Sequence, residues 1–347
     1  MLKFNDQERS LSIDKNYMPL TSLTLYQLMA YSKTRLSVLG LKAYYFTNRG
    51  VIKAVDDISL TIKENESLGI AGESACGKSS FGSAILRTMQ PPGKIVEGSI
   101  VLNDIDITKL ADVDFNKSIR WKKIAMIFQG AMNTLDPVYT IGDQMKEILE
   151  QHCFKDRNIE EKISVSLEQV GLDRSTAKRY PHELSGGMKQ RVIISMSLLL
   201  EPDVVIADEP TTALDVLVQR QIIDLLKKLK KERGMVIILI THDLAIISEI
   251  ADRIGIMYAG QMVEFGNVDD VYKNPKHPYT QALISSIPKL YSEEGQIHFI
   301  KGSPPDMLNL PAGCRFYPRC PHAMDICKSD PPAFKIGDSY VLCWLYK

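Results

Sequence analysis

The sequence predicts an α/β fold built on a parallel sheet whose strands are buried on both faces. Val204–Ala207 and Val236–Ile240 are short β-branched runs without polar alternation, which is typical of parallel strands covered by helices on both sides. Strand-like and helix-like segments alternate from Ser37 to about Gly266. Between the two apolar runs, Val216–Arg233 has the length of a crossover helix, so the three segments predict a βαβ unit.

The other elements follow in chain order. Residues 1–33 show no clear period, and two explanations stay open: translation truly begins at Met29, or the segment is a poorly ordered arm. Leu39–Phe46 gives the first strong strand signal. A second strand is predicted at Leu68–Ala71, a helix at 79–87, a third strand at 124–128 and a mainly helical region at 131–200.

Composition limits the possible functions. A chain of 347 residues has room for one large domain and a smaller one. Lys+Arg and Asp+Glu balance at 42 each, so no net field attracts nucleic acid or an anionic membrane. No apolar stretch approaches the ~18–20 residues that cross a bilayer, and the N-terminus does not resemble a secretory signal. We therefore expect a cytosolic or membrane-peripheral protein without a nucleic-acid partner.

Residues 72–79 read Gly-Glu-Ser-Ala-Cys-Gly-Lys-Ser, which matches the phosphate-binding pattern G-x-x-x-x-G-K-S/T between a strand and a helix. Backbone N–H groups of such a loop form a concave anion site. Lys78 would reach the β- and γ-phosphates of a nucleotide, and the Ser79 hydroxyl would hold Mg²⁺. The predicted nucleotide-binding residues here are Gly72, Glu73, Ser74, Ala75, Cys76, Gly77, Lys78, Ser79 and Ser80.

Two residues inside this loop, Ala75 and Cys76, affect its backbone conformation and its chemistry. If Ala75 requires a positive φ, its Cβ costs ~1–2 kcal/mol, a tolerable strain. Cys76 lies near Lys78 and a helix N-terminus, a setting that lowers a thiol pKa. The alternative, which we favour, is that Cys76 is a small filler residue.

The predicted strand Val204–Ala207 ends in two acids. Asp208 at the strand tip would hold the Mg²⁺ shell, and Glu209 would orient and deprotonate an attacking water. The alternative is an acidic turn at a strand end, because Pro210 follows immediately. The phosphate-binding loop in the same chain favours the catalytic interpretation.

Residues 184–191 read Leu-Ser-Gly-Gly-Met-Lys-Gln-Arg and lead into a predicted helix, Met188–Leu200. This segment resembles the signature motif of ABC-type ATPases. The resemblance implies a P-loop NTPase fold of the ABC type, with a RecA-like core and a helical subdomain at about 131–200. It also implies that two such subunits pair head-to-tail. The signature residues that would then act on the partner's ATP are Ser185, Gly186, Gly187 and Gln190.

The remaining marks of that family also match. Gln129 fits the Q-loop and would join Ser79 and Asp208 around Mg²⁺. Thr212-Ala213-Leu214-Asp215 fits the D-loop, and His242 fits the catalytic switch histidine that contacts the γ-phosphate. Tyr45 resembles the aromatic residue on which adenine stacks, although its two aromatic neighbours compete for that role and an ordinary strand aromatic is the alternative.

The composition changes after Gly266, where prolines crowd a tail that holds four of the six cysteines. His277–Leu283 and Gly313–Cys320 resemble the C-terminal extension of oligopeptide/dipeptide-permease ATPases. We therefore predict an N-terminal extension at 1–33, an ABC ATPase domain at 34–266 and a C-terminal extension at 267–347.

The tail cysteines follow the spacing C-x5-C-x6-C-x15-C and are Cys314, Cys320, Cys327 and Cys343. A short segment with little apolar core needs another source of stability, which favours a structural metal. A cytosolic location argues against disulfides. The paired knuckles of zinc sites are missing, whereas four thiolates suit a 4Fe–4S cluster, which members of the resembling subfamily carry. Zinc, and free or disulfide-linked thiols, are the alternatives. Cys153 lies apart and is predicted to be a small buried hydrophobe.

The resemblance implies an ATP-hydrolysing subunit that powers the import of oligopeptides, dipeptides or a related solute such as an oligosaccharide. Its partners would be a second homologous ATPase chain, two membrane-spanning permease subunits and, indirectly, an extracellular solute-binding protein. It would lie on the cytoplasmic face of the cell membrane. The alternatives are a soluble ABC ATPase in DNA repair or translation, and a redox-sensing iron–sulfur ATPase.

Overall fold

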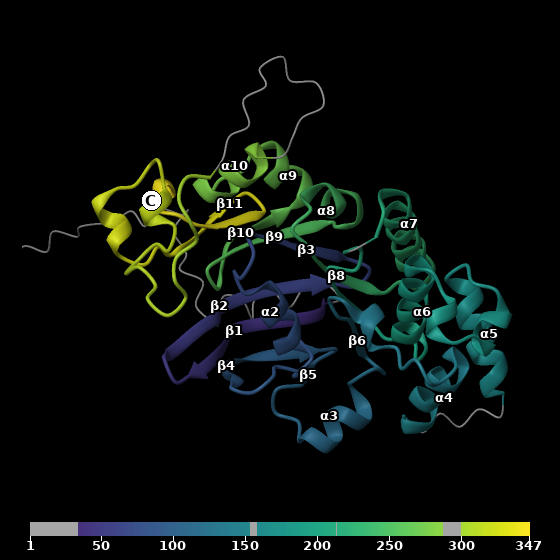
Figure 1. The fold of residues 1–347 in the computed structure, drawn as a ribbon. Coiled ribbons are helices and arrows are strands. Elements are labelled where there is room, and N and C mark those ends of the chain that lie inside the picture. The colour runs from purple at the N-terminus through teal and green to yellow at the C-terminus, as the bar shows by residue number, and fades with distance from the viewer. Residues whose placement is uncertain (1–33, 153–157, 213, 287–299) are drawn as a thin grey trace, which may run out of the picture.

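The computed structural model describes residues 34–152, 158–212, 214–286 and 300–347. The predictions made for residues 1–33 and for Cys153 lie outside these ranges. Figure 1 shows a central body of sheets, a group of helices around α4 to α7 on one side, and the C-terminal extension on the other.

The larger sheet has eight strands in the order β11-β12-β10-β9-β3-β8-β7-β6. Strands β9, β3, β8, β7 and β6 run parallel, and β10, β12 and β11 are antiparallel to their neighbours. The predicted parallel strands and their adjacency are confirmed. The bounds are β3 Ser67–Ala71, β6 Ile124–Ile127, β7 Val204–Asp208, β8 Val236–Ile240, β9 Arg253–Tyr258, β10 Gln261–Asn267, β11 Ala333–Ile336 and β12 Ser339–Leu342.

Both faces of this sheet are buried, as the unalternating apolar runs predict. Side chains of successive strand residues point to opposite faces. Val205 and Ala207 belong to the core that the helices around α6 and α7 cover, whereas Val204 and Ile206 belong to the core shared with α2 and the second sheet.

The second sheet is antiparallel, with the order β2-β1-β4-β5, and it packs over α2 (Figure 1). Its strands are β1 Thr34–Thr47, β2 Gly50–Lys63, β4 Gly93–Leu102 and β5 Ile105–Asp106. The predicted strand at Leu39–Phe46 is the middle of β1.

Polar side chains define where the helices begin. Thr140, Ser185 and Asp215 each accept a backbone N–H at the start of α4, α6 and α7, which satisfies donors that a helix N-terminus leaves unpaired. The helix α7 has the predicted bounds and ends at Gly234, whose φ is 63°. Up to Ile250, the described residues form the α-helices α2 Lys78–Ile85, α3 Asp112–Ser118, α4 Ile141–Gln151, α5 Ile159–Gln169, α6 Gly186–Leu198, α7 Val216–Arg233 and α8 Leu244–Ile250. Among the residues that the structure describes, no helix is long and apolar enough to span a bilayer.

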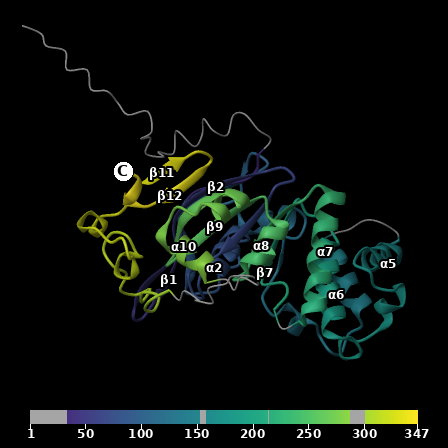
Figure 2. The ribbon, with the colours of Figure 1, turned by 90° about the horizontal axis from the view of Figure 1, so that it is seen from above.

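The C-terminal extension begins with α9 (Val268–Lys273) and α10 (Pro278–Ser285) and continues the large sheet. Strand β12 pairs with β10 through Glu264 and Phe265, so two tail strands extend the edge of the larger sheet (Figure 2). Phe316 is 1% exposed and lies in the main core. The expectation of a tail with little apolar core is therefore wrong, because the tail shares the core of the larger domain.

Candidate nucleotide-binding site

Four parallel strands bring the predicted motifs to one edge of the sheet. Ile70 of β3 and Asp208 of β7 both lie opposite Ile240 of β8, and Ile127 of β6 lies opposite Ala207. The loops that follow these strands therefore leave the sheet side by side, since carboxyl ends of parallel strands meet at one edge. They carry the phosphate-binding loop, His242, Glu209 and Gln129.

Two glycines of the loop have no room for a side chain. A Cβ on Gly72 would lie 2.1 Å from the carbonyl oxygen of Met257, and one on Gly77 would lie 1.9 Å from that of Ala54. Their φ angles are 152° and 104°, and that of Ala75 is 61°. Ala75 thus adopts the positive φ considered from the sequence, with the cost of its Cβ. The loop leads into α2, whose N-terminus has no side-chain cap, so its N–H groups can meet an anion.

Lys78 lies over the loop that contains it. Its Nζ donates to the carbonyl oxygens of Gly72 at 2.8 Å and Glu73 at 2.9 Å, and its side chain is largely buried. These contacts hold a cation where the backbone N–H groups of the loop converge.

The burial of Cys76 agrees with a small filler residue, the alternative that we favour from the sequence. It is 4% exposed, and burial raises the pKa of its thiol, although the nearby Lys78 charge opposes that change. The neighbouring cation is present, but loss of water outweighs it, so the net shift of the thiol pKa is upward.

Asp208 and Ser79 offer oxygen ligands beside the loop. Burial raises the pKa of Asp208, and a hydrogen bond with Ser79 opposes that rise. The other carboxylate oxygen, Oδ1, is buried without a hydrogen-bond partner. An unpartnered carboxylate oxygen next to a hydroxyl fits Mg²⁺, which takes one or two protein ligands and completes its shell with phosphates and water.

Glu209 is fixed by two neighbours. Its Oε1 lies 2.9 Å from His242 Nδ1, and its Oε2 accepts a hydrogen bond from Thr212 Oγ1 at 2.7 Å. Burial by itself would raise the pKa of Glu209, but the hydrogen bonds from His242 and Thr212 leave the pKa below its usual value. The backbone of Glu209 has a φ of 49°, a strained conformation of the kind that functional sites retain. The side chain is therefore an ionised, oriented carboxylate.

The structure places Gln129 and Tyr45 near this edge in different ways. Gln129 is exposed and lies one residue beyond the end of β6, the neighbour of β7, with Phe128 between them. The hydroxyl of Tyr45 lies 3.3 Å from Ser80 Oγ at the start of α2. Its rival Tyr44 donates to Asp56 on the adjacent strand, whereas Phe46 lies under Lys94. Of the three aromatics, Tyr45 is the one that contacts the helix of the phosphate-binding loop.

The signature residues belong to the helical region and not to the loop's edge (Figures 1 and 2). Ser185 caps α6 through the N–H of Met188 at 3.3 Å and, with Gly186, is exposed, whereas Gln190 is buried. A Cβ on Gly187 would lie 2.7 Å from the side chain of Val218 on α7. Next to it, Asp215 caps α7.

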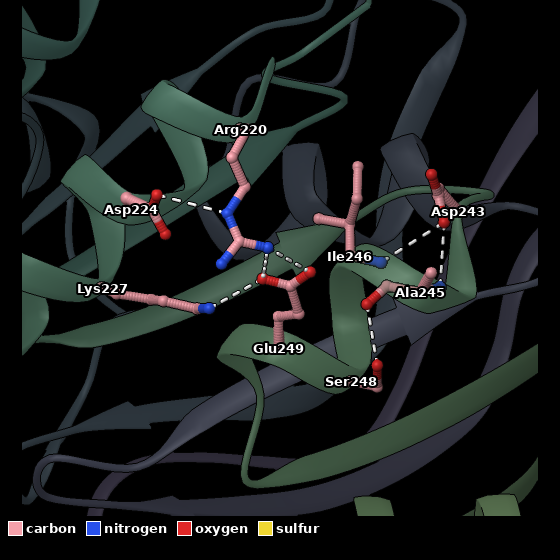
Figure 3. A network of polar contacts seen from close by, with 8 residues as sticks. All are labelled: Arg220, Asp224, Lys227, Asp243, Ala245, Ile246, Ser248 and Glu249. Atoms are coloured by element: carbon pink, nitrogen blue, oxygen red, sulfur yellow. Dashed lines mark hydrogen bonds and ion pairs between the residues drawn. The ribbon is translucent and has the colours of Figure 1, made fainter. Parts of the chain in front are cut away.

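An exposed ion network joins α7 to α8, the helix that follows His242. Figure 3 shows Arg220 and Lys227 of α7 converging on Glu249 of α8, with all three contacts at 2.8 Å. At the start of α8, Asp243 accepts the N–H groups of Ala245 and Ile246 and fixes the helix next to His242. Because these ion pairs are exposed, they contribute little to stability.

Sequence reasoning missed three residues of this site. Thr212 holds Glu209, and Arg319 and Tyr279 of the extension both bind Glu73 inside the phosphate-binding loop. Thr212 stands in the D-loop segment and Tyr279 in the tail motif, but no pattern in the sequence gives their partners. The two arginines of the segment Gly313–Cys320 are the signal that could have drawn attention to Arg319.

The four tail cysteines come from neighbouring segments. Cys314 N–H donates to the carbonyl oxygen of Cys327 at 2.9 Å. Burial raises the pKa of Cys343 to about 11, with smaller contributions from Cys314, Cys320 and Cys327. Within the described ranges, however, no group of three or more His, Cys, Asp or Glu side chains is arranged as metal ligands. The geometry therefore does not support the predicted cluster or its zinc alternative.

Comparison with known proteins agrees with the motifs found at this site. The family profile described as "ABC transporter" matches residues 55–212, and "Oligopeptide/dipeptide transporter, C-terminal region" matches residues 263–327. An oligopeptide transport ATP-binding protein AppD of Bacillus subtilis (strain 168) is 45% identical, over 90% of this chain and 97% of its own length. The chain belongs to the ATP-binding subunits of the oligopeptide/dipeptide ABC transporter family.

Other members of this family match equally well over most of their length. The dipeptide transport ATP-binding protein DppD of Caldanaerobacter subterraneus subsp. tengcongensis is 43% identical, over 89% of this chain and 96% of its own. The oligopeptide transport ATP-binding protein OppD of Escherichia coli (strain K12) is 44% identical, over 86% and 88%. These matches confirm the ABC ATPase, and they give no support to DNA repair, translation or redox sensing.

Solved structures confirm the fold of the ATPase domain. The dimeric ATP-binding cassette MJ0796 bound to ADP and Pi is 29% identical, with a TM-score of 0.60, and covers 67% of this chain and 98% of its own. The protein cbiO1 from Clostridium perfringens is 27% identical, with a TM-score of 0.59, over 70% and 92%.

Proposed function

We propose that this chain hydrolyses ATP to power the import of oligopeptides or dipeptides, or of a related solute such as an oligosaccharide. The names of its relatives refer to dipeptide and oligopeptide transport. The observation that carries the ATPase chemistry is the oriented carboxylate of Glu209, held by His242 at the carboxyl edge beside the phosphate-binding loop.

In this proposal the residues of the site take different tasks. Glu209 is the general base for the attacking water, His242 contacts the γ-phosphate, and Tyr45 stacks on adenine. Mg²⁺, when bound, neutralises phosphate charge and would be held by Ser79, Asp208 and Gln129. The loop residues that bind the nucleotide are Gly72, Glu73, Ser74, Ala75, Cys76, Gly77, Lys78, Ser79 and Ser80. The proposed domains are 34–266 for the ATPase, with its helical subdomain at about 131–200, and 267–347 for the extension.

We infer that two ATPase chains pair head-to-tail, with Ser185, Gly186, Gly187 and Gln190 of one chain facing ATP bound to the other, and Asp215 at the junction. The support is the exposed helix N-terminus at Ser185, a second anion site away from the phosphate-binding loop. A homologous second chain is the proposed partner. Two permease subunits and, indirectly, an extracellular solute-binding protein complete the transporter, which places this chain on the cytoplasmic face of the membrane.

We also propose that the extension binds a 4Fe–4S cluster through Cys314, Cys320, Cys327 and Cys343, with zinc as the alternative. The support is the spacing of these four cysteines in the sequence alone, because the described residues show no arrangement of metal ligands. Anaerobically purified protein should be brown and should contain about four irons per chain. Colourless protein with one tightly bound zinc would favour the alternative, and protein without either metal would refute both.

Two variants test the ATPase assignment. Glu209→Gln should nearly abolish hydrolysis and leave ATP binding intact, because it removes the base and keeps Asp208 and Ser79. Lys78→Ala should weaken ATP binding itself, because it removes a cation beside the phosphates. Equilibrium binding of ATP–Mg²⁺ and steady-state phosphate release measure the two effects. Turnover of Glu209→Gln within a few-fold of wild type would contradict the proposed base.

A further inference from the structure

Glu73, the second residue of the phosphate-binding loop, is held at all of its polar groups. Its N–H donates to the hydroxyl of Tyr279 at 2.8 Å, and its carbonyl oxygen accepts from Lys78 Nζ at 2.9 Å. Its two carboxylate oxygens accept from Arg319, Oε2 from Nη1 at 2.7 Å and Oε1 from Nη2 at 3.0 Å. Two of these three partners belong to the C-terminal extension.

The guanidinium of Arg319 is itself rigidly placed. Its side chain is 6% exposed, and that of Glu73 is 23% exposed. Its Nε donates to the carbonyl oxygen of Lys301 at 2.9 Å, and Nη2 also donates to that of Gly302 at 3.3 Å. A further donor reaches the hydroxyl of Tyr258 at 3.2 Å. A bidentate pair with so many fixed donors specifies geometry as well as charge.

An aromatic cluster packs next to the Arg319–Glu73 pair. The rings of Tyr258, Tyr279 and Phe316 have centroid separations of 4.6 Å, 5.3 Å and 5.4 Å. Tyr279 and Phe316 come from the extension and Tyr258 from β9 of the ATPase sheet. The cluster therefore fixes Arg319 and the Tyr279 hydroxyl relative to the sheet that carries the loop.

We propose that Arg319 of the C-terminal extension is a positioning residue for ATP binding, acting through Glu73 of the phosphate-binding loop. The inference rests on the proposed role of residues 72–79. Glu73 places a negative charge next to a site for phosphates, which repels them unless a cation neutralises it. Arg319 neutralises this charge and turns the carboxylate away from the loop's N–H groups, so that the loop keeps the shape that accepts the triphosphate.

A role in folding alone makes a different prediction. If Arg319 only anchors the extension, its loss has the same effect on ATP binding whether or not Glu73 is charged. If it acts through Glu73, removing the carboxylate removes most of the effect. A double-mutant cycle separates the two cases, because only coupled residues deviate from additivity.

The experiment measures the ATP–Mg²⁺ dissociation constant of the full chain in a Glu209→Gln background, and KM and kcat in the native background. Arg319→Ala should weaken ATP binding about tenfold, which corresponds to ~1.4 kcal/mol, and should raise KM more than it lowers kcat. Arg319→Lys, which keeps the charge, should recover part of the affinity. In a Glu73→Gln background, Arg319→Ala should change the affinity by less than about threefold. In a Trp121→Phe background, the fluorescence of Trp344 reports whether the extension is still folded.

The matched control is Arg220→Ala, which removes an exposed arginine from the Glu249 network of Figure 3 and should leave ATP affinity unchanged. Equal losses with and without the Glu73→Gln substitution, or wild-type affinity of Arg319→Ala, would overturn the inference. The Lys78→Ala variant distinguishes a failure of the positioning role of Arg319 from a failure of the proposed function. If Lys78→Ala binds ATP normally, the assignment of the loop is wrong, whereas a loss there combined with a silent Arg319→Ala refutes only the positioning role.

Discussion

Arg315 joins the C-terminal extension to the ATPase domain, and its replacement by alanine tests how strongly. Its guanidinium binds the carboxylate of Asp56 on β2 and the carbonyl oxygen of Ala259 after β9. The side chains of Arg315 and Asp56 are 8% and 12% exposed, so the pair is nearly buried. Arg315→Ala therefore leaves a carboxylate without its main cation in a place that water hardly reaches.

The cost follows from this burial. Breaking a buried ion pair by removing one partner costs ~3–5 kcal/mol, because the remaining charge has lost both water and its partner. Asp56 keeps the hydrogen bond from the Tyr44 hydroxyl and the half-exposed Lys53 ammonium at 4.0 Å, which places the expected loss at the lower end. A loss of ~3 kcal/mol lowers the unfolding midpoint of a domain this large by about 6 °C, at ~2 °C per kcal/mol.

Thermal and urea unfolding in a Trp121→Phe background measure the effect, since Trp344 then is the remaining tryptophan and lies in the extension. The control is Arg174→Ala, because Arg174 binds Glu168 and Glu161 at the exposed surface, where water replaces the lost contacts. We expect no measurable shift in that control. A midpoint of Arg315→Ala within about 1 °C of wild type, well below the shift of ~2 °C per kcal/mol expected here, would refute the idea that this contact anchors the extension.

Three further outcomes are expected. Ala75→Gly should raise the unfolding midpoint slightly and keep ATP affinity. Removing the Cβ relieves ~1–2 kcal/mol of backbone strain at φ 61°, which exceeds the ~0.4–1 kcal/mol by which glycine stabilises the unfolded chain through its greater conformational entropy. A lower midpoint would contradict this. Gly72→Ala should instead abolish ATP binding measured by calorimetry, since its Cβ would lie 2.1 Å from the Met257 carbonyl oxygen. His277→Asn should flatten the loss of stability in acid, as urea unfolding at several pH values would show. Burial lowers the pKa of His277 to about 3. Between the ordinary histidine pKa of ~6.5 and pH 3, the unfolded chain therefore binds a proton that the native state does not. The free energy of unfolding falls as the pH falls through this window. Asparagine keeps the acceptor that caps α10 and removes this proton; an unchanged slope would exclude His277 as its source.

The parts of the fold that sequence predicts are those set by local patterns. The bounds of α7 follow from an Asp at one end and a Gly at the other, and β8 follows from five apolar residues in a row. The helix α6 begins at Gly186, two residues before its predicted start, because the Ser185 cap allows glycines in its first turn. The carboxylate of Glu209 is predictable because a strand end fixes its place.

The contacts of the extension could not be predicted in the same way. Arg319 lies 246 positions from Glu73, and β12 pairs with β10 far from it in sequence. Such contacts depend on the tertiary structure, which the local hydrophobic periodicity of the sequence does not reveal. The proline-rich, cysteine-bearing composition of the tail indicated a separate unit held by a metal, whereas its buried Tyr279 and Phe316 belong to the ATPase core. Its buried Phe334, Val341 and Cys343 form a small cluster of their own.

The position of the extension also explains why it continues the sheet instead of packing as a separate unit. Strand β10 would otherwise be an open edge, which exposes unpaired backbone groups and invites unwanted strand pairing. Pairing with β12 covers β10, moves the open edge to the short strand β11 and fixes the path of the chain between residues 300 and 347. Because the same segment carries Arg315 and Arg319, one arginine fastens it to β2 and the other reaches the phosphate-binding loop. A tail attached by a flexible linker could not hold Arg319 in a bidentate contact, so the strand pairing is the structural condition for the proposed positioning of Glu73.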